Sequence, residues 1–234
     1  MADDTTVVWE RPERGARGPA PERSRAQITA IAVELADADG LAALSIRAVA
    51  KRLETGPASL YRYVAGRDDL LDLMADAVAG ELDLGVPLST DPVEDMVALA
   101  VQVKALHLRH PWLNDLPPEP LRLGPNGLAY LDRALQVLAP APLADRAKLE
   151  AIATLNAMAA LFARTQAQAG RTPTGRQAAQ AAYLAKAAAE GTHRWLTAAI
   201  GHDGSDDPFD DPDALFARIA RQVLTGWLRG EQTV

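Results

Sequence analysis

The sequence predicts an all-α fold of nine or ten helices, because nearly every patterned stretch repeats apolar residues at helical spacing. Ala and Leu dominate these stretches, and no run alternates apolar and polar residues as a half-buried strand would. Of the 234 residues, 48% are hydrophobic and 24% are charged, a balance typical of folded proteins with one or two domains. We therefore expect an N-terminal three-helix unit followed by a larger helical domain.

Residues 1–22 contain Gly and Pro without an apolar period, which predicts a flexible N-terminal arm. The first helix is expected to begin at Ser24, whose hydroxyl forms a capping box with the Gln27 side chain three residues later. Gly40 supplies a residue suited to the left-handed conformation at the end of this helix. These signals mark residues 23–80 as the first folded unit.

Two short helices are expected to follow, and together with the first helix they make up the three-helix unit. Ser45 caps a helix over residues 45–53, and Pro57 occupies the first turn of a helix over residues 57–63. Gly66 then opens a fourth helix, whose first turn carries acidic residues that favour the helix dipole.

A second domain is expected over residues 85–234, and it begins with a loop at residues 85–91. Its apolar periods predict helices over residues 92–110, 125–138, 145–168, 174–200 and 212–230. Six Asp residues between positions 203 and 213 indicate a solvated loop. Their spacing lacks the Gly and the terminal Glu of a calcium-binding EF-hand.

Several classes of protein are excluded by what the chain lacks. It has no cysteine, which excludes disulfides and cysteine-based sites, and its longest uncharged apolar run, residues 151–163, is shorter than the roughly 20 residues of a membrane span. The N-terminus lacks the pattern of a signal peptide, so we expect a cytoplasmic protein with no membrane partner. His107 and His110 have no third ligand nearby, and no nucleotide-binding or catalytic motif is present. We therefore expect no metal, no cofactor and no enzymatic activity.

Charge is unevenly distributed along the chain. The net charge is −7, yet the stretch from position 47 to position 67 has a local charge of +4, from Arg47, Lys51, Arg52, Arg62 and Arg67 against Glu54. Phosphate contacts act within a Debye length of about 8 Å. An acidic chain with one basic face is therefore compatible with binding to DNA.

The two short helices predicted between positions 45 and 63 have the spacing of a helix-turn-helix. The second is too short to hold a core by itself, which indicates that it is displayed. It carries Ser59, Arg62 and Tyr63, residue types that bond phosphates and base edges. Arg47 and Arg67 flank it as clamps on the DNA backbone would. The alternative is an ordinary helical hairpin.

The stretches LSIRAVAKRL, LYRYV and GRDDLL carry a resemblance to a known family. Over residues 24–74 the chain resembles the N-terminal domain of TetR-family transcriptional regulators. Further along, HPWL and GPNGLAYLDRAL are similar to the tetracycline-repressor-like ligand domain. The resemblance implies a ligand-responsive dimeric repressor that binds a palindromic double-stranded DNA operator. A small-molecule effector would lower its DNA affinity.

The resemblance also implies roles for individual residues. The expected DNA-binding residues are Arg47, Thr55, Gly56, Pro57, Ser59, Tyr61, Arg62, Tyr63 and Arg67. Arg67 matches a basic residue that binds a phosphate together with the N-terminus of the fourth helix. Tyr61 matches a tyrosine that touches a phosphate, although an aromatic residue at this spacing also suits packing alone. The family usually has Gly where this chain has Glu54, and a non-Gly residue with positive φ costs roughly 1 kcal/mol there.

The second domain is expected to bind the effector and to form the dimer. Candidate pocket residues are His107, Trp112, Tyr130, Asn156, Met158 and Phe162, each of which also suits an ordinary core. The resemblance implies that the helix around residues 151–163 and the last helix form a four-helix dimer interface. The last helix presents Leu215, Ile219, Val223 and Trp227 at helical spacing. The alternative is that this stripe belongs to the core of a monomer.

Two other interpretations stay open at this stage. An all-helical enzyme would need a catalytic site outside the usual motifs. A helical interaction module or an activator would have lost or weakened operator binding. A steep dependence of DNA affinity on salt separates a true DNA-binding protein from an interaction module.

Overall fold

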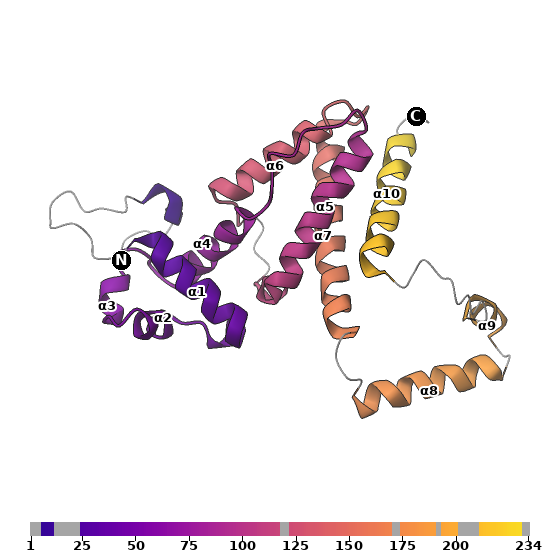
Figure 1. The fold of residues 1–234 in the computed structure, drawn as a ribbon, viewed down its shortest axis with the longest axis horizontal. Coiled ribbons are helices and arrows are strands. Elements are labelled where there is room, and N and C mark those ends of the chain that lie inside the picture. Colours follow the sequence, from indigo (N-terminus) through magenta and orange to yellow (C-terminus); the bar gives the residue numbers. More distant parts are fainter. Residues whose placement is uncertain are drawn as a thin grey trace.

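The computed structural model describes residues 6–11, 24–117, 122–169, 174–190, 193–200 and 211–230. Within this part of the chain the secondary structure consists of helices α1 to α10 and three 3-10 helices, η1 to η3, without a strand (Figure 1). The predicted all-α fold is confirmed. Most of the predicted arm and residues 201–210 of the predicted acidic loop lie outside the described residues.

The N-terminal unit is built from one long helix and several short ones. Its elements are α1 (Arg25–Asp39), η2 (Leu41–Ala43), α2 (Ile46–Arg52), α3 (Pro57–Leu60) and α4 (Arg67–Ala79). Ser24 and Gln27 form the predicted capping box, with the Ser24 hydroxyl accepting the Gln27 N–H at 3.2 Å. Side chains from all four α-helices are fully buried in one core, among them Ile28, Val49, Leu60, Leu70 and Met74.

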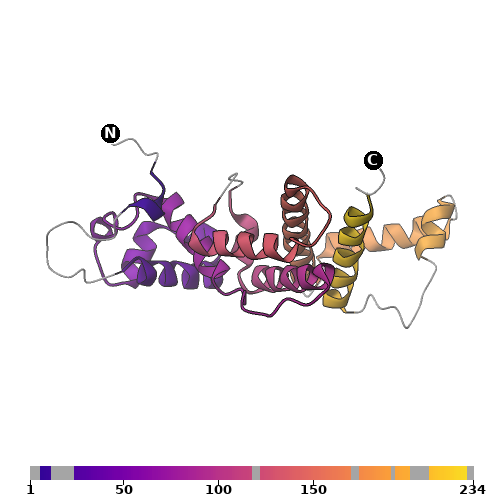
Figure 2. The same ribbon diagram turned by 90° about the horizontal axis from the view of Figure 1, so that it is seen from above.

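The C-terminal domain is a bundle around α5 (Figure 2). Its elements are α5 (Pro92–Arg109), η3 (Pro111–Asp115), α6 (Pro125–Val137), α7 (Asp145–Ala169) and α10 (Pro212–Gly230). The carboxylate of Asp91 caps α5 by accepting the N–H of Val93 at 2.9 Å. None of the helices in the described ranges is long and apolar enough to cross a membrane.

The single helix predicted over residues 174–200 is wrong, because two helices occupy this stretch. They are α8 (Gly175–Ala189) and α9 (Arg194–Ile200). Between them the sequence has Gly191, a residue of low helix propensity. Both helices project away from α7 and α10 (Figure 1). Residues 175–189 contain no buried side chain.

Part of the predicted flexible arm is docked on the protein, which corrects the prediction for residues 6–11. The 3-10 helix η1 (Val8–Glu10) contacts α4, and the Val8 side chain is 0% exposed. Trp9 lies so close to Gly124, just before α6, that a Cβ at this glycine would clash with the ring. The apolar side chains of Val8 and Trp9 explain the docking, since they remove apolar surface from water.

The N-terminal unit is joined to the C-terminal domain through α4 and α6. The buried carboxylate of Asp76 on α4 accepts the Gly127 N–H in the first turn of α6 at 2.9 Å. The Asn126 side chain donates to the same carboxylate at 3.1 Å. Asp76 therefore caps α6 from the neighbouring helix and links α4 to the C-terminal domain.

Candidate nucleic-acid interface and ligand region

The two helices of the predicted helix-turn-helix pack against each other and against the core of the N-terminal unit. The Ser45 hydroxyl caps α2 by accepting the Ala48 N–H at 3.1 Å. Val49 of α2 and Leu60 of α3 are both 0% exposed. The helix of residues 57–60 ends earlier than predicted, and residues 61–63 continue it as turns. Its apolar side is thus buried, and its other side faces solvent.

The turn between α2 and α3 keeps a left-handed residue despite the missing glycine. Glu54 has φ of 52° and is, in the part of the chain that the structure describes, the one non-glycine residue with positive φ. The Thr55 N–H donates to the Ala50 carbonyl at 2.9 Å and closes the turn. The fold therefore accepts a cost of roughly 1 kcal/mol at Glu54, and it places a carboxylate beside the expected DNA surface.

Three expected contact residues form a small network at the start of α3. The hydroxyl groups of Thr55 and Ser59 lie 2.9 Å apart, and the Ser59 hydroxyl donates to the Gly56 carbonyl at 2.7 Å. These bonds hold Ser59 in one orientation. Gly56 and Pro57 are exposed beside them. This end of α3 therefore presents a small, ordered polar surface.

The two tyrosines that follow α3 lie on opposite sides of the chain. Tyr61 is 58% exposed, so packing alone does not account for it. Tyr63 is only 5% exposed and belongs to the core, so little of its side chain is accessible for the predicted contact with DNA. The Tyr63 carbonyl instead accepts the Arg25 side chain at 3.1 Å.

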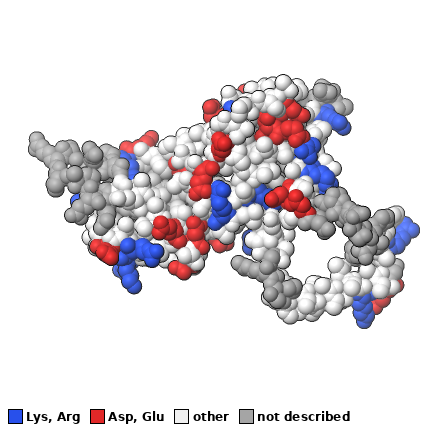
Figure 3. Space-filling model, in the orientation of Figure 1, with Lys and Arg blue, Asp and Glu red and all other residues white. Residues whose placement is uncertain are grey.

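Basic side chains surround this surface. Arg47 and Arg62 are exposed on either side of the turn, and Figure 3 shows blue basic atoms gathered over α2. Arg67 begins α4 and donates one guanidinium nitrogen to the Leu41 carbonyl at 2.8 Å, which fixes its position. Nearby, the side chain of Arg11 forms an ion pair with Asp69 in the first turn of α4. Arg11 thereby offsets a negative charge next to the site where a phosphate is expected.

The six candidate pocket residues make their contacts with different helices. Tyr130 on α6 donates to Asn156 on α7 at 2.6 Å, and burial raises the pKa of Tyr130 to about 12. Phe162 on α7 instead meets Phe216 on α10, with their ring centroids 5.4 Å apart. Met158 is partly buried against the core. The first pair thus joins α6 to α7, and the second joins α7 to α10.

The other two candidates lie at the end of α5 and in η3. His107 forms a hydrogen bond with Asn114 at 3.1 Å, and burial lowers the pKa of this histidine. Trp112 is fully buried and donates its indole N–H to Asp37 of α1 at 2.8 Å. Trp112 therefore contacts the N-terminal unit. Sequence reasoning missed this bond, because the two residues are far apart in the chain.

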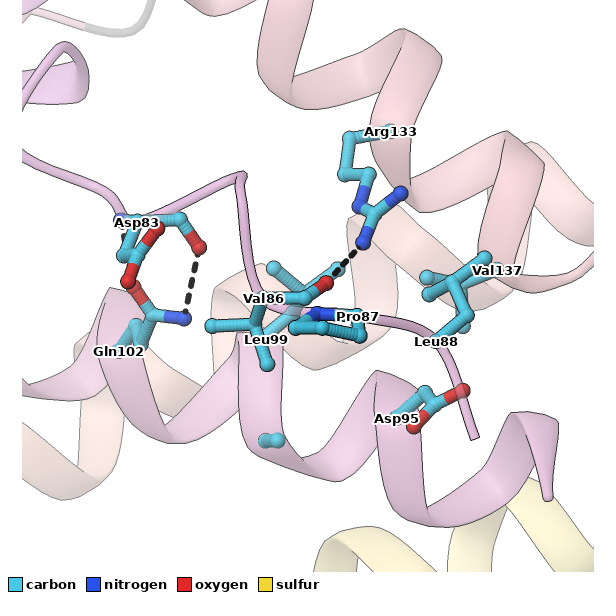
Figure 4. Close-up of a pocket in the computed structure, with 10 residues that line it drawn as sticks. Asp83, Val86, Pro87, Leu88, Asp95, Leu99, Gln102, Arg133 and Val137 are labelled. Atoms are coloured by element: carbon cyan, nitrogen blue, oxygen red, sulfur yellow. Dashed lines mark hydrogen bonds between the residues drawn. The ribbon is translucent and has the colours of Figure 1, made fainter. Parts of the chain in front are cut away.

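A surface pocket lies between the loop after α4 and helices α5 and α6 (Figure 4). It is partly open to solvent and is lined by Asp83, Val86, Pro87, Leu88, Asp95, Ala98, Leu99, Gln102, Arg133 and Val137. None of the six candidates lines it. Gln102 bonds the backbone of Asp83 in both directions, and Arg133 donates to the Val86 carbonyl. The polar groups of the pocket thus hold the loop against the bundle.

The predicted interface stripe on α10 is half-buried within the single chain. Leu215, Ile219, Val223 and Trp227 all have this intermediate exposure. The neighbouring stripe of Phe216, Ala220 and Leu224 is fully buried against the bundle. On α7, Leu161 is 61% exposed. Apolar side chains therefore remain uncovered on both helices. Within the described ranges, no group of three acidic or histidine side chains is arranged to hold a metal ion.

The chain matches known families over both of its parts. Residues 28–74 match the family described as "Bacterial regulatory proteins, tetR family", and residues 89–227 match "Tetracyclin repressor-like, C-terminal domain". The HTH-type transcriptional repressor DrrR1 of Streptomyces coeruleorubidus is 33% identical over 99% of this chain and 89% of its own length. An HTH-type transcriptional regulator of Saccharopolyspora erythraea is 38% identical over 58% of this chain and 57% of its own length.

Solved structures agree with these matches. Apo ActR from Streptomyces coelicolor is similar with a TM-score of 0.73 and 26% identity, over 92% of this chain and 99% of ActR. ActR in complex with actinorhodin has the same TM-score and identity, over 90% of this chain and 98% of that one. Together with the exposed helix-turn-helix and the helical C-terminal domain, these matches show that the chain belongs to the TetR family of transcriptional regulators, which bind DNA and respond to ligands.

Proposed function

We propose that this protein is a cytoplasmic, non-enzymatic repressor that binds a palindromic operator as a homodimer and leaves it when an aromatic small molecule binds. The observation that carries the proposal is the turn-linked pair α2 and α3, buried on one side and polar on the other. A displayed helix of this kind suits the major groove, where side chains reach base edges.

The contacts with DNA divide into two kinds. Ser59 and Thr55, held together at 2.9 Å, face the groove at the start of α3 and would contact base edges. Arg47, Tyr61 and Arg67 lie around the rim and would contact phosphates, which position the protein without selecting a sequence. Tyr63 is left out of this set because its side chain is buried.

The dimer would form through α7 and α10. The half-buried stripe on α10 and the exposed Leu161 on α7 offer apolar surface that a second copy would cover. Two recognition helices related by a two-fold axis would then meet two half-sites about one helical turn apart. The boundary between the DNA-binding unit and the ligand and dimer domain would lie in the loop at residues 81–91.

The proposed effector is a planar molecule with several fused or linked aromatic rings. This class is supported by the similarity to ActR, which has been solved with actinorhodin. In the present chain, Phe162 and Phe216 offer an aromatic contact, while Tyr130 and Asn156 offer polar groups. Such a ligand would have to bind differently to the operator-bound and free conformations in order to weaken DNA binding.

The test is a selection of duplexes from a random or genomic DNA pool by the full-length protein. We expect an enriched palindrome and a steep fall of log affinity with log salt. Addition of actinorhodin as a probe of the effector class is then expected to release the enriched duplex from the wild type and less readily from Phe162→Ala. Folded protein that enriches no sequence at low salt would contradict operator binding. A duplex retained at saturating actinorhodin would contradict only the effector class.

A further inference from the structure

A buried histidine lies where the DNA-binding unit meets the ligand domain. His110 directly follows α5 and is 7% exposed. Its backbone N–H still bonds the Leu106 carbonyl at 2.9 Å, so the ring moves with α5. Three elements surround the ring: the last turn of α1, the segment after α4, and η3.

Both nitrogens of the His110 ring face carboxylates from different elements. Nδ1 lies 2.8 Å from Oδ1 of Asp37 on α1, and Nε2 lies 3.1 Å from Oε1 of Glu81 after α4. Trp112 of η3 donates to the same oxygen of Asp37 at 2.8 Å. Arg109 pairs with the second oxygen of Glu81 at 3.0 Å. The ring therefore bridges the C-terminal ends of α1 and α4.

The chemistry of this bridge depends on the proton content of the ring. An ionised carboxylate only accepts hydrogen bonds, so both bonds form only when both ring nitrogens carry a proton. A neutral imidazole donates from one nitrogen and leaves the other facing an acceptor. Hydrogen bonds between charged partners are shorter and stronger than neutral ones. The bridge therefore depends on an imidazole ring, whose two nitrogens each face one of the two carboxylates.

The same short segment also belongs to the region that we assign to the effector. His107 lies one turn before His110 on α5, and its ring bonds Asn114 of η3. A shift of α5 or η3 caused by a ligand would move His110 and Trp112 together. Through Asp37, that shift would reach α1, against which α2 and α4 pack. The path from ligand domain to recognition helix is therefore short and consists of described contacts.

We propose that His110 is the positioning residue that couples the two parts of the molecule, through the bridge from Asp37 to Glu81. The inference rests on the proposed function, since it assigns a route between operator and effector sites. Coupling between two binding sites is reciprocal, so operator binding must also alter the ligand-domain end of the bridge. That consequence can be measured without knowing the natural effector.

The experiment is hydrogen exchange of the full-length dimer with and without the operator duplex enriched in the selection. In the wild type, the duplex is expected to change the exchange of residues 107–116, which lie outside the DNA contact surface. In His110→Gln this operator-dependent change is expected to be lost. Asp37→Asn is the second variant: it keeps an oxygen for Trp112, and its side chain is 32% exposed, so the fold is expected to survive.

The matched control is Arg109→Gln, which removes the more exposed ion pair with Glu81 and leaves the contact with α1 intact. It is expected to keep the operator-dependent change. A merely structural role of His110 would raise exchange equally with and without the duplex and leave their difference as in the wild type. That result, or a wild type that binds the duplex with no change at residues 107–116, would overturn the inference, as would loss of the change in Arg109→Gln. A wild type that binds no duplex would overturn the proposed function instead.

Discussion

The DNA-binding unit and the ligand domain present their candidate functional residues in opposite ways. In the first, the apolar faces of α2 and α3 are buried, and the residues expected at DNA lie outside, as Tyr61 does. In the second, the candidates are buried or half-buried against the core of the bundle, as Tyr130 and Phe162 are. Candidates for DNA contact thus need exposure to solvent, whereas candidates for ligand contact lie where side chains also form the core. Substitutions should separate the two regions: removal of a side chain expected at DNA should change DNA binding alone, whereas substitutions inside the bundle should also change stability.

Disruption of the proposed dimer should reduce DNA binding more than any other change discussed here. Trp227→Asp places a charge in the proposed interface on α10, and an uncompensated buried charge costs about 3–5 kcal/mol. Sedimentation velocity should show a monomer, and titration with the enriched duplex should show lost binding although the DNA-binding unit is intact. Gln222→Asp, at an exposed position of the same helix, is the control and should remain dimeric. A stable Trp227→Asp dimer would show that the interface lies elsewhere.

Arg67→Ala tests the rim of the DNA-binding surface. Removal of one phosphate contact should weaken binding to every sequence and lower the slope of log affinity against log salt by about one. Fluorescence anisotropy with the enriched duplex and with an unrelated duplex measures both quantities. Arg67→Lys keeps the charge and should retain most of the slope. Equal affinity of wild type and Arg67→Ala would remove this residue from the phosphate contacts.

Ser59→Ala tests the groove-facing side of the same surface. The loss of one hydrogen bond is expected to reduce discrimination at one base position by about 1 kcal/mol, with little change for unrelated DNA. A repeated selection with the variant measures the preference at each position. Thr55→Val, which removes the hydroxyl partner of Ser59, should loosen the same position to a smaller extent. An unchanged preference in both variants would mean that this pair does not face the bases.

Glu54→Gly is a change at the surface that should increase both the stability of the protein and its affinity for DNA. Glycine adopts positive φ without the steric cost, so the free energy of unfolding should rise by roughly 1 kcal/mol. The change also removes a carboxylate near the phosphates, which should tighten binding to all duplexes. Chemical denaturation and anisotropy check the two effects. Glu54→Gln isolates the second effect, since it removes the charge and keeps the strained conformation; if it binds DNA no more tightly than the wild type, the carboxylate does not oppose binding.

Local signals made most of the fold predictable. The capping box at Ser24 and Gln27 and the proline at the start of α3 act within a few residues, so sequence alone locates these helix starts. The docking of Trp9 beside Gly124 depends on a partner more than a hundred positions away, so no local sequence pattern predicts it. The same holds for the bond between Trp112 and Asp37.

The candidate site also has a part that the sequence predicts and a part that depends on contacts between distant residues. The polar residues on α3 and directly after it are unusual for a helix that only packs, so the candidate DNA-binding residues stand out in the sequence, apart from Tyr63. Candidate ligand residues do not stand out, because an aromatic side chain that fills a core and one that lines a cavity have the same spacing on a helix. The contacts of Tyr130 with Asn156 and of Phe162 with Phe216 become visible only in the structure.

The weakest of these effects is a change in stability with pH, which arises from His107 at the end of α5. Burial lowers the pKa of His107 below its ordinary value of 6.5, so below that value the unfolded chain binds more protons on this group than the folded protein. The free energy of unfolding should therefore fall as the pH drops through 6.5, and it should carry no such penalty above that value. Thermal denaturation at several pH values should show a shallower fall in His107→Gln than in the wild type. His193→Gln, at an exposed histidine, should behave like the wild type, and operator affinity near neutral pH should differ little among the three proteins. If the stability of wild type and His107→Gln depended equally on pH, a protonated His107 ring would carry no penalty in the folded protein. The contrast between a solvated DNA surface and a desolvated ligand region would then not hold at this residue.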